Sequence, residues 1–343
     1  MAPSPSAVAT PSSSSPLEAE QYVDTLLDWS RLLDEPWVAI YMSERASEAL
    51  CDDGLFPLRD KLRELFSANG ITDYSVNDVA KVVDRLMTLT PSFEAFFSIR
   101  DVLAENLTIQ PDILRLCSGT RLQSDLARCI VLIAILRGHC QEPVRDHSLI
   151  LRSAPGNTVA VRAMIQILEH ERTDMRETPK PPDYFEGDVL VCHDFRGLVE
   201  CLDEGMILLR ASDNLGVETA IRVAIYKWRL SSGSVPNWED VPEYRIGKRF
   251  LDSFQELTPS RELAERLLRA VVETLEGVNL ADIHWLRNGS GGNAPQRLRA
   301  SDKAKAWRRD IDREHHLHYW KCDDTTIELA SVSFPHDDFN IPE

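Results

Sequence analysis

The chain has 343 residues, of which 43% are hydrophobic and 27% charged, and its formal net charge is −17. This composition is too apolar for a disordered protein, and the length accommodates two or three domains of roughly 100–200 residues each. The acidic total disfavours broad binding to nucleic acid or to anionic membranes, although a total conceals local asymmetry.

Residues 1–16, MAPSPSAVATPSSSSP, predict a disordered tail because they lack the basic and apolar regions of a signal peptide. The longest apolar run, residues 129–136, is far shorter than the ~20 residues of a membrane-spanning helix. We therefore expect a cytoplasmic protein without a membrane partner. The cysteines are scattered and never form a C-x-x-C pair, so neither a disulfide framework nor a structural zinc site is indicated. We expect no cofactor.

Residues 17–176 predict a mainly α-helical N-terminal domain. Apolar residues recur at helical spacing in the stretches 19–33, 58–69, 76–88, 93–105, 124–136 and 159–171. The proline-rich stretch 177–183 cannot continue a helix. We place a domain boundary there.

A small mixed α/β domain is expected at residues 185–255. Residues 188–192 and 206–210 are short apolar runs typical of buried strands, and residues 216–230 have helical spacing. Residues 256–343 predict an α+β domain, with a helix at 260–276 that starts at Ser260 and stops at Gly277. Strands are expected at 306–311, 315–321 and 326–334. The predicted fold class is therefore α+β, with several domains.

The last region reverses the charge of the chain, because nine basic residues stand against four acidic ones between His284 and Lys321. Side chains alternate along a strand, so a strand at 315–321 places His316, His318 and Trp320 on one face. An antiparallel return of the next strand brings His336 toward the same surface. The sequence thus predicts a cluster of imidazoles in a basic setting.

Three interpretations of this cluster stay open. In the first, His316 and His318 bind a metal with His336 or Asp337, since these ligand types suit zinc or iron. In the second, the imidazoles supply the acid and base that cleave RNA, and neighbouring arginines hold phosphate. In the third, they are edge-strand residues with no reactive role.

The segment from Trp307 onward resembles the C-terminal half of the RelE/YoeB superfamily of bacterial toxins. The pattern of that family is aromatic-Ser-Arg-Arg-Ile, an acidic turn, Glu-His-Arg-Leu-Val-Tyr, and a last strand that ends in a functional His. This chain has Trp-Arg-Arg-Asp-Ile at 307–311, Asp-Arg-Glu-His-His-Leu-His-Tyr at 312–319, and a last strand that reaches His336. The resemblance covers residues 256–343, including the helix at 260–276.

The resemblance implies a RelE-like α+β fold and metal-independent cleavage of RNA through its 2′-hydroxyl. His336 matches the general acid of the family, while His316 stands where the family has an Arg. Gln296 is nearest to the general-base Glu, and an amide cannot take a proton there.

We therefore expect an RNA-binding and RNA-cleaving protein, with RNA or the ribosome as its partner. The expected catalytic residues are His316, His318 and His336. The expected substrate-binding residues are Arg297, Arg299, Arg308, Arg309 and Trp320. The alternative is a non-enzymatic helical scaffold that binds a protein partner through its acidic helical region.

Overall fold

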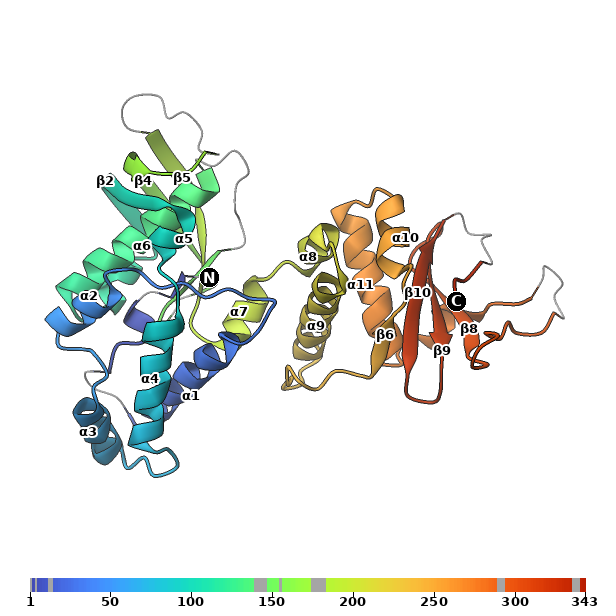
Figure 1. The fold of residues 1–343 in the computed structure, drawn as a ribbon, viewed down its shortest axis with the longest axis horizontal. Coiled ribbons are helices and arrows are strands. Elements are labelled where there is room, and N and C mark those ends of the chain that lie inside the picture. The colour runs from blue at the N-terminus through green and yellow to red at the C-terminus, as the bar shows by residue number, and fades with distance from the viewer. Residues whose placement is uncertain are drawn as a thin grey trace. The chain divides into compact units, whose positions relative to one another are not determined.

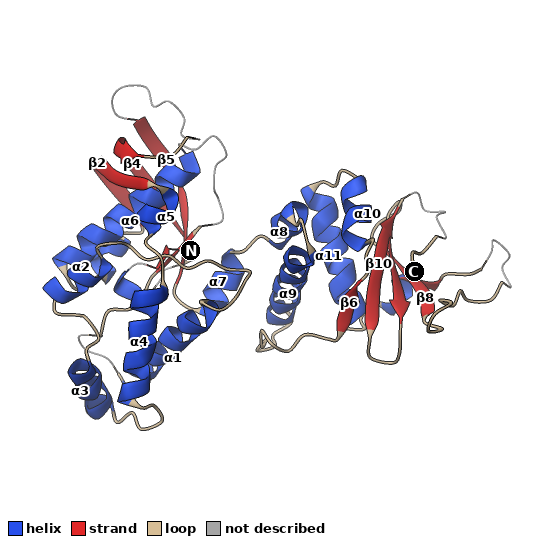
Figure 2. Cartoon of the chain, viewed as in Figure 1, coloured by secondary structure: helices blue, strands red, loops and turns tan. Residues whose placement is uncertain are grey.

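The computed structural model describes residues 2–3, 5–11, 15–138, 147–153, 156–173, 183–288, 294–334 and 340–343. The chain divides into two compact units, Met1–Cys201 and Leu202–Glu343 (Figure 1). Both units combine helices with a sheet (Figure 2), so the predicted α+β class is confirmed. Among the described helices, none has the length and apolarity needed to cross a membrane.

A five-stranded sheet in the order β1-β3-β5-β4-β2 forms the centre of the first unit. Its strands β3 and β5 are parallel, while β4 runs antiparallel to both β5 and β2. The strands are β1 (Ala2–Pro3), β2 (Ile99–Gln110), β3 (Ser148–Ile150), β4 (Thr158–His170) and β5 (Asp183–Cys192).

Helix α6 (Thr120–Gly138) packs on this sheet, as Figure 1 shows. Its residues 129–136 are buried on every side of the helix, because all of them are apolar. The remaining helices of the unit are η1 (Pro5–Ala7), α1 (Pro16–Leu32), α2 (Ala46–Asp52), α3 (Arg59–Asn69), α4 (Val76–Leu89), α5 (Phe93–Phe97), η2 (Ile113–Leu116) and α7 (Phe195–Cys201).

Two stretches that were expected to be helices contain strands, so the prediction of a mainly α-helical domain at 17–176 is wrong at these two places. Helix α5 ends at Phe97, Ser98 adopts a left-handed conformation with φ 55°, and the chain continues as β2. The stretch 159–171 is β4, in which Val161, Ala163 and Ile165 are buried between exposed neighbours. Pairing between β2 and β4 joins residues that are distant in sequence, and helical spacing within one window cannot detect it.

The second unit contains a five-stranded sheet in the order β6-β10-β9-β8-β7, antiparallel except for the pair β6 and β10. The strands predicted at 306–311, 315–321 and 326–334 are confirmed as β8, β9 and β10. The strands are β6 (Tyr244–Ile246), β7 (Ile283–Trp285), β8 (Lys305–Asp310), β9 (His316–Lys321) and β10 (Ile327–Ser333).

Helices cover one side of this sheet (Figure 2). The prediction of a strand at 206–210 is wrong: these residues lie in α8, whose N-cap Asp203 accepts a hydrogen bond from the Met206 amide at 3.0 Å. Helix α11 follows Ser260 as its N-cap and stops before Gly277, as predicted. The helices are α8 (Glu204–Arg210), α9 (Asn214–Ser231), α10 (Phe250–Glu256), α11 (Arg261–Leu275) and η3 (Leu280–Asp282).

The two faces of the second sheet are covered differently. Leu317 and Tyr319 belong to the apolar core shared with the helices. The alternate residues of β9, including Trp320, lie on the opposite face with a smaller apolar cluster that contains Ile341. Residues near the C-terminus therefore cover the face on which the histidines project.

The segments predicted to be a domain boundary and a disordered tail each contain residues of the first sheet. The proline-rich boundary at 177–183 falls almost entirely outside the described residues, and β5, which follows it, pairs with β3 and β4 of the first unit. Within the N-terminal segment that was expected to be disordered, β1 pairs with β3, and Ala7, Val8 and Ala9 are buried.

Candidate functional site

Polar side chains occupy one face of the second sheet in two rows that cross its strands. Directly opposite residues of an antiparallel pair project to the same face, so each row follows from the register of the strands. We call this surface the polar face. Its first row is His284, Arg308, His318 and Ser331, and its second row is Asp310, His316 and Ser333.

Asp310 lies between two imidazoles of the polar face. Its Oδ1 atom is 3.0 Å from Nδ1 of His316, and its Oδ2 atom is 3.5 Å from Nε2 of His284. His316 is buried, whereas the side chains of His284 and Asp310 are 47% and 36% exposed. One carboxylate therefore lies within ion-pair distance of a solvent-accessible imidazole and of a buried one.

Both ring nitrogens of His318 have hydrogen-bond partners within the second unit. Nε2 lies 3.1 Å from Oγ of Ser333, and Nδ1 lies 3.2 Å from the carbonyl oxygen of Asn340. A carbonyl only accepts hydrogen bonds, so we assign the ring proton of neutral His318 to Nδ1 and let Nε2 accept from the Ser333 hydroxyl. The ring thereby ties two strands to the C-terminal segment.

The register separates the predicted arginines. Arg308 belongs to the polar face, whereas Arg309 projects to the opposite face and is completely buried. The Arg309 guanidinium donates to Oε2 of Glu273 at 2.8 Å and to the carbonyl oxygen of Val278 at 2.6 Å. Its charge is therefore neutralised within the unit, away from the histidines.

Arg299 and Trp320 contact each other beneath the C-terminal segment. The guanidinium of Arg299 lies 5.3 Å from the ring centre of Trp320 and forms ion pairs with Asp302 at 2.6 Å and Glu328 at 2.8 Å. Trp320 is completely buried and donates to the carbonyl oxygen of Pro342 at 2.8 Å. These contacts give Arg299 and Trp320 a structural role.

The other predicted residues lie around the edge of the polar face or outside the described ranges. Arg297 is half-buried, and its Nε atom lies 3.4 Å from Oδ1 of Asn288. Gln296 donates to the carbonyl oxygen of Ala306 at 2.9 Å. His336 lies outside the described residues.

Two of the earlier interpretations can be compared with this geometry. The proposal that the histidines are edge-strand residues is wrong for His316 and His318, because β9 is the central strand of its sheet. Within the described ranges, no three His, Cys, Asp or Glu side chains are grouped so that they could hold a metal ion.

A pocket of about 410 Å³ opens beside the polar face. Strand β6 pairs with residues 327–329 of β10, and farther along this edge of β10 the Val332 amide donates to Oγ of Ser253 at 2.9 Å. Ser331 and Ser333 line the pocket from this edge, Arg249 and Ser253 line it from the region of α10, and Asn340 lines it from the C-terminal segment. The hydroxyl that is bonded to His318 therefore belongs to a residue at the wall of a cavity.

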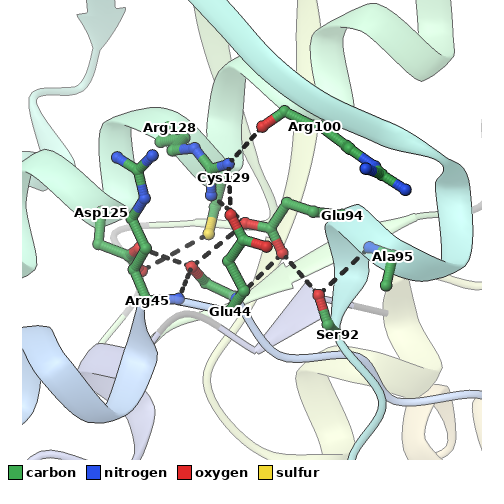
Figure 3. Close-up of polar contacts among 10 residues, drawn as sticks. Glu44, Arg45, Ser92, Glu94, Ala95, Arg100, Asp125, Arg128 and Cys129 are labelled. Carbon is green, nitrogen blue, oxygen red and sulfur yellow. Dashed lines mark hydrogen bonds and ion pairs between the residues drawn. The ribbon is translucent and has the colours of Figure 1, made fainter. Parts of the chain in front are cut away.

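A second polar cluster lies in the first unit, where Figure 3 shows Arg128 pointing toward two glutamates. Arg128 pairs with the completely buried Glu94, with Oε1 of Glu44 at 3.1 Å, and with the carbonyl oxygen of Arg100 at 3.1 Å. Glu94 also accepts from the Glu44 amide at 3.0 Å and from the Ser92 hydroxyl at 3.2 Å. This network joins α6 to the segments before α2 and α5.

His284, Asp310 and the cluster around Arg128 are not among the site residues predicted from the sequence. Alternation along 306–311 places Arg308 and Asp310 on one face, but the pairing of β7 with β8 brings His284 to them. In the first unit, the sequence contains one sign of the cluster: Asp125 and Arg128 stand beside the apolar run of α6. Charged residues next to a buried run need partners. No family model matches the chain, and no curated protein or solved structure is similar enough to count as a match.

Proposed function

We propose that the second unit binds RNA and cleaves it without a metal ion, at the solvent-accessible end of the polar face. The observation that carries this proposal is the position of Asp310 between His284 and His316, with Arg308 directly opposite His284 in the strand register. An imidazole, an orienting carboxylate and a guanidinium are the groups that RNA cleavage through the 2′-hydroxyl requires. We propose the cytoplasm as its compartment, since RNA and ribosomes are found there.

The proposed reaction proceeds as follows. His284 takes the proton from the 2′-hydroxyl while the 2′-oxygen attacks the adjacent phosphorus. Asp310 stabilises the imidazolium that forms, and Arg308 stabilises the negative charge on the phosphoryl oxygens. The bond from phosphorus to the 5′-oxygen breaks, and water protonates that oxygen. The products are a 2′,3′-cyclic phosphate and a 5′-hydroxyl end.

Two further features support RNA as the substrate. The segment around the polar face is locally basic in an acidic chain, which favours contact with phosphates. The order of one helix and three strands, α11, β8, β9 and β10, is compatible with the proposed resemblance to the RelE/YoeB superfamily of ribosome-dependent endoribonucleases. His316 and His318 are buried, whereas the His284 side chain is 47% exposed, so we propose His284 as the base.

Incubation of the full chain with an end-labelled single-stranded RNA in excess chelator tests the proposal. We expect fragments that end in 2′,3′-cyclic phosphate, and none from an RNA that carries a 2′-deoxy group at the cleaved position. His284→Ala and Arg308→Ala should each lower the rate about 100-fold, the usual size of such contributions.

His193→Ala is the matched control, because His193 in the first unit has a similar ion pair. Its Nε2 atom lies 3.3 Å from Asp194, and the two side chains are 49% and 41% exposed. We expect wild-type activity from this variant. Absence of cleavage by the wild-type chain, or a full rate for His284→Ala, would overturn the proposal.

A second candidate function is that of a non-enzymatic interaction protein, with a binding surface on the first sheet in place of the acidic helical region expected from the sequence. The exposed apolar side chains of Leu103, Leu168 and Tyr184 on β2, β4 and β5 favour it, because apolar groups on an accessible sheet suit a protein partner. On this candidate the wild-type chain cleaves no RNA, and Leu103→Asp and Tyr184→Asp should each abolish capture of the partner. Capture that is unchanged in both variants would contradict it.

A further inference from the structure

A groove between α2 and α6 in the first unit is lined almost entirely by ionisable side chains, and its volume is about 380 Å³. The lining residues follow one face of each helix, at the spacing i, i+3, i+4 and i+7. They are Arg45, Glu48, Ala49 and Asp52 from the α2 region, and Arg121, Ser124, Asp125 and Arg128 from α6.

The floor of this groove is held by the network of Figure 3. The Arg128 side chain is only 10% exposed and is fixed by Glu44 and Glu94. Ser43 donates to Oδ1 of Asp125 at 2.6 Å and accepts a hydrogen bond from the Arg45 amide at 3.2 Å. Because these contacts exist before any ligand arrives, the floor is preorganised for binding.

Asp125 has one oxygen that lacks a strong donor. The residue is 4% exposed, and its Oδ2 atom meets only the Cys129 thiol, at 3.8 Å, among the described residues. A thiol is a weak donor. Burial raises the pKa of Asp125, and the charge of Glu94 adds to this effect, while Arg128 and Arg45 oppose it. A buried carboxylate of this kind is stabilised by a cationic N–H donor.

The cations of the groove differ in the ion pairs that they form with described residues. Arg121 lies 3.5 Å from Asp52, whereas the guanidinium of Arg45 forms no ion pair within the part of the chain that the structure describes. Glu48 lies one helical turn beyond Arg45 on the same helix face. After these pairings, one positive group and two carboxyl groups face the groove.

We infer that this groove binds a small zwitterion of the amino-acid type. Its carboxylate lies on the guanidinium of Arg45, whose planar fork matches a carboxylate bidentately. Its ammonium group lies between Asp125 and Glu48 and donates to the free side of the Asp125 carboxylate. Among the described residues, the lining includes no aromatic ring and one aliphatic residue, Ala49, so the geometry favours a small polar ligand over a nucleobase. This inference is independent of RNA cleavage.

Titration calorimetry of the full chain tests the inference, with L-glutamine, L-glutamate and L-arginine as probes. We expect saturable one-to-one binding of at least one of them. Butylamine and butyrate, which each carry one of the two charges, should bind at least tenfold more weakly. The inference would be overturned if none of the three amino acids gave a binding signal, or if butylamine bound as tightly as the best of them.

Variants locate the binding in the groove. Arg45→Ala and Glu48→Gln change exposed side chains and should fold normally, and each should weaken binding about tenfold, as expected for one charge-assisted contact. Arg63→Ala removes an exposed guanidinium on α3, outside the groove, and should bind like the wild type. Unchanged affinity in both groove variants would contradict the assignment.

Discussion

Ser333 Oγ lies 3.1 Å from His318 Nε2, at a position where both side chains are buried. The other ring nitrogen of His318 contacts the carbonyl oxygen of Asn340, so one imidazole joins β10, β9 and the C-terminal segment. Buried polar groups are costly when they lose a partner. This relationship makes His318 a structural residue of the polar face.

His318→Leu should therefore destabilise the second unit. The change removes the partner of the Ser333 hydroxyl and of the Asn340 carbonyl, and each buried group left without a hydrogen bond costs about 1–3 kcal/mol. We expect the free energy of unfolding in urea to fall by about 2–4 kcal/mol. His193→Leu, at an exposed site, should change it by less than about 0.5 kcal/mol, and equal losses in the two variants would contradict the assignment.

The ion pair between Arg309 and Glu273 should be the most sensitive contact of the second unit. Arg309 is completely buried, and Arg309→Met leaves Glu273, which is 15% exposed, with the Asn279 amide but without its cation. Breaking a buried pair from one side costs about 3–5 kcal/mol, so we expect a loss of that size in urea unfolding.

The double variant Arg309→Met with Glu273→Leu removes both charges and should recover most of that loss, because apolar residues of similar volume can replace a buried pair. Arg266→Ala breaks the solvent-accessible pairs with Glu262 on the same helix and with Asp312, and it should cost less than about 1 kcal/mol. A double variant as unstable as Arg309→Met alone would show that packing, and not charge, is responsible.

The stability of the first unit should depend on pH through His147. Burial lowers the pKa of His147 from 6.5 to about 3, and Arg137 adds to the effect. Between pH 6.5 and 3, the unfolded chain therefore binds a proton at His147 that the folded chain does not bind. The contribution of His147 to the free energy of unfolding is fully present above pH 6.5 and decreases as the pH falls toward 3. At pH 5 it has decreased by about 2 kcal/mol.

His147→Phe keeps a ring among Tyr41, Phe93 and Phe97 and removes the titrating group. The difference in unfolding free energy between pH 7 and pH 5 should shrink by about 2 kcal/mol in this variant. Urea unfolding of both chains at the two pH values measures it. An identical pH dependence would mean that His147 is protonated in the folded state.

The loss of stability on mutation should alternate along β4, because its side chains are alternately buried and exposed. Ile165 is completely buried and Gln166 is exposed. Ile165→Ala should cost about 2–5 kcal/mol through lost contacts and a cavity, while Gln166→Ala should cost less than about 0.5 kcal/mol. Similar losses at both positions, measured by thermal unfolding, would contradict the strand.

Local signals in the sequence were sufficient for much of the second unit. The N-cap Ser260 and the stop at Gly277 define α11 through contacts within a few residues, and the strands β8, β9 and β10 alternate clearly between turns. The same period of two correctly placed His316 and His318 on one face. Helix caps, turns and the alternation of strand residues depend on residues that are close in the sequence, so they can be identified from the sequence alone.

The tertiary structure alone decided what those residues contact. Pairing of β7 with β8 brought His284 to Asp310, and pairing of β2 with β4 turned two helix-like stretches of the first unit into strands. The covering of β9 by the C-terminal residues, through the Asn340 and Pro342 carbonyls, determined that His318 is buried while His284 is accessible. Burial and partners depend on contacts between residues far apart in the chain, and the local sequence does not specify them.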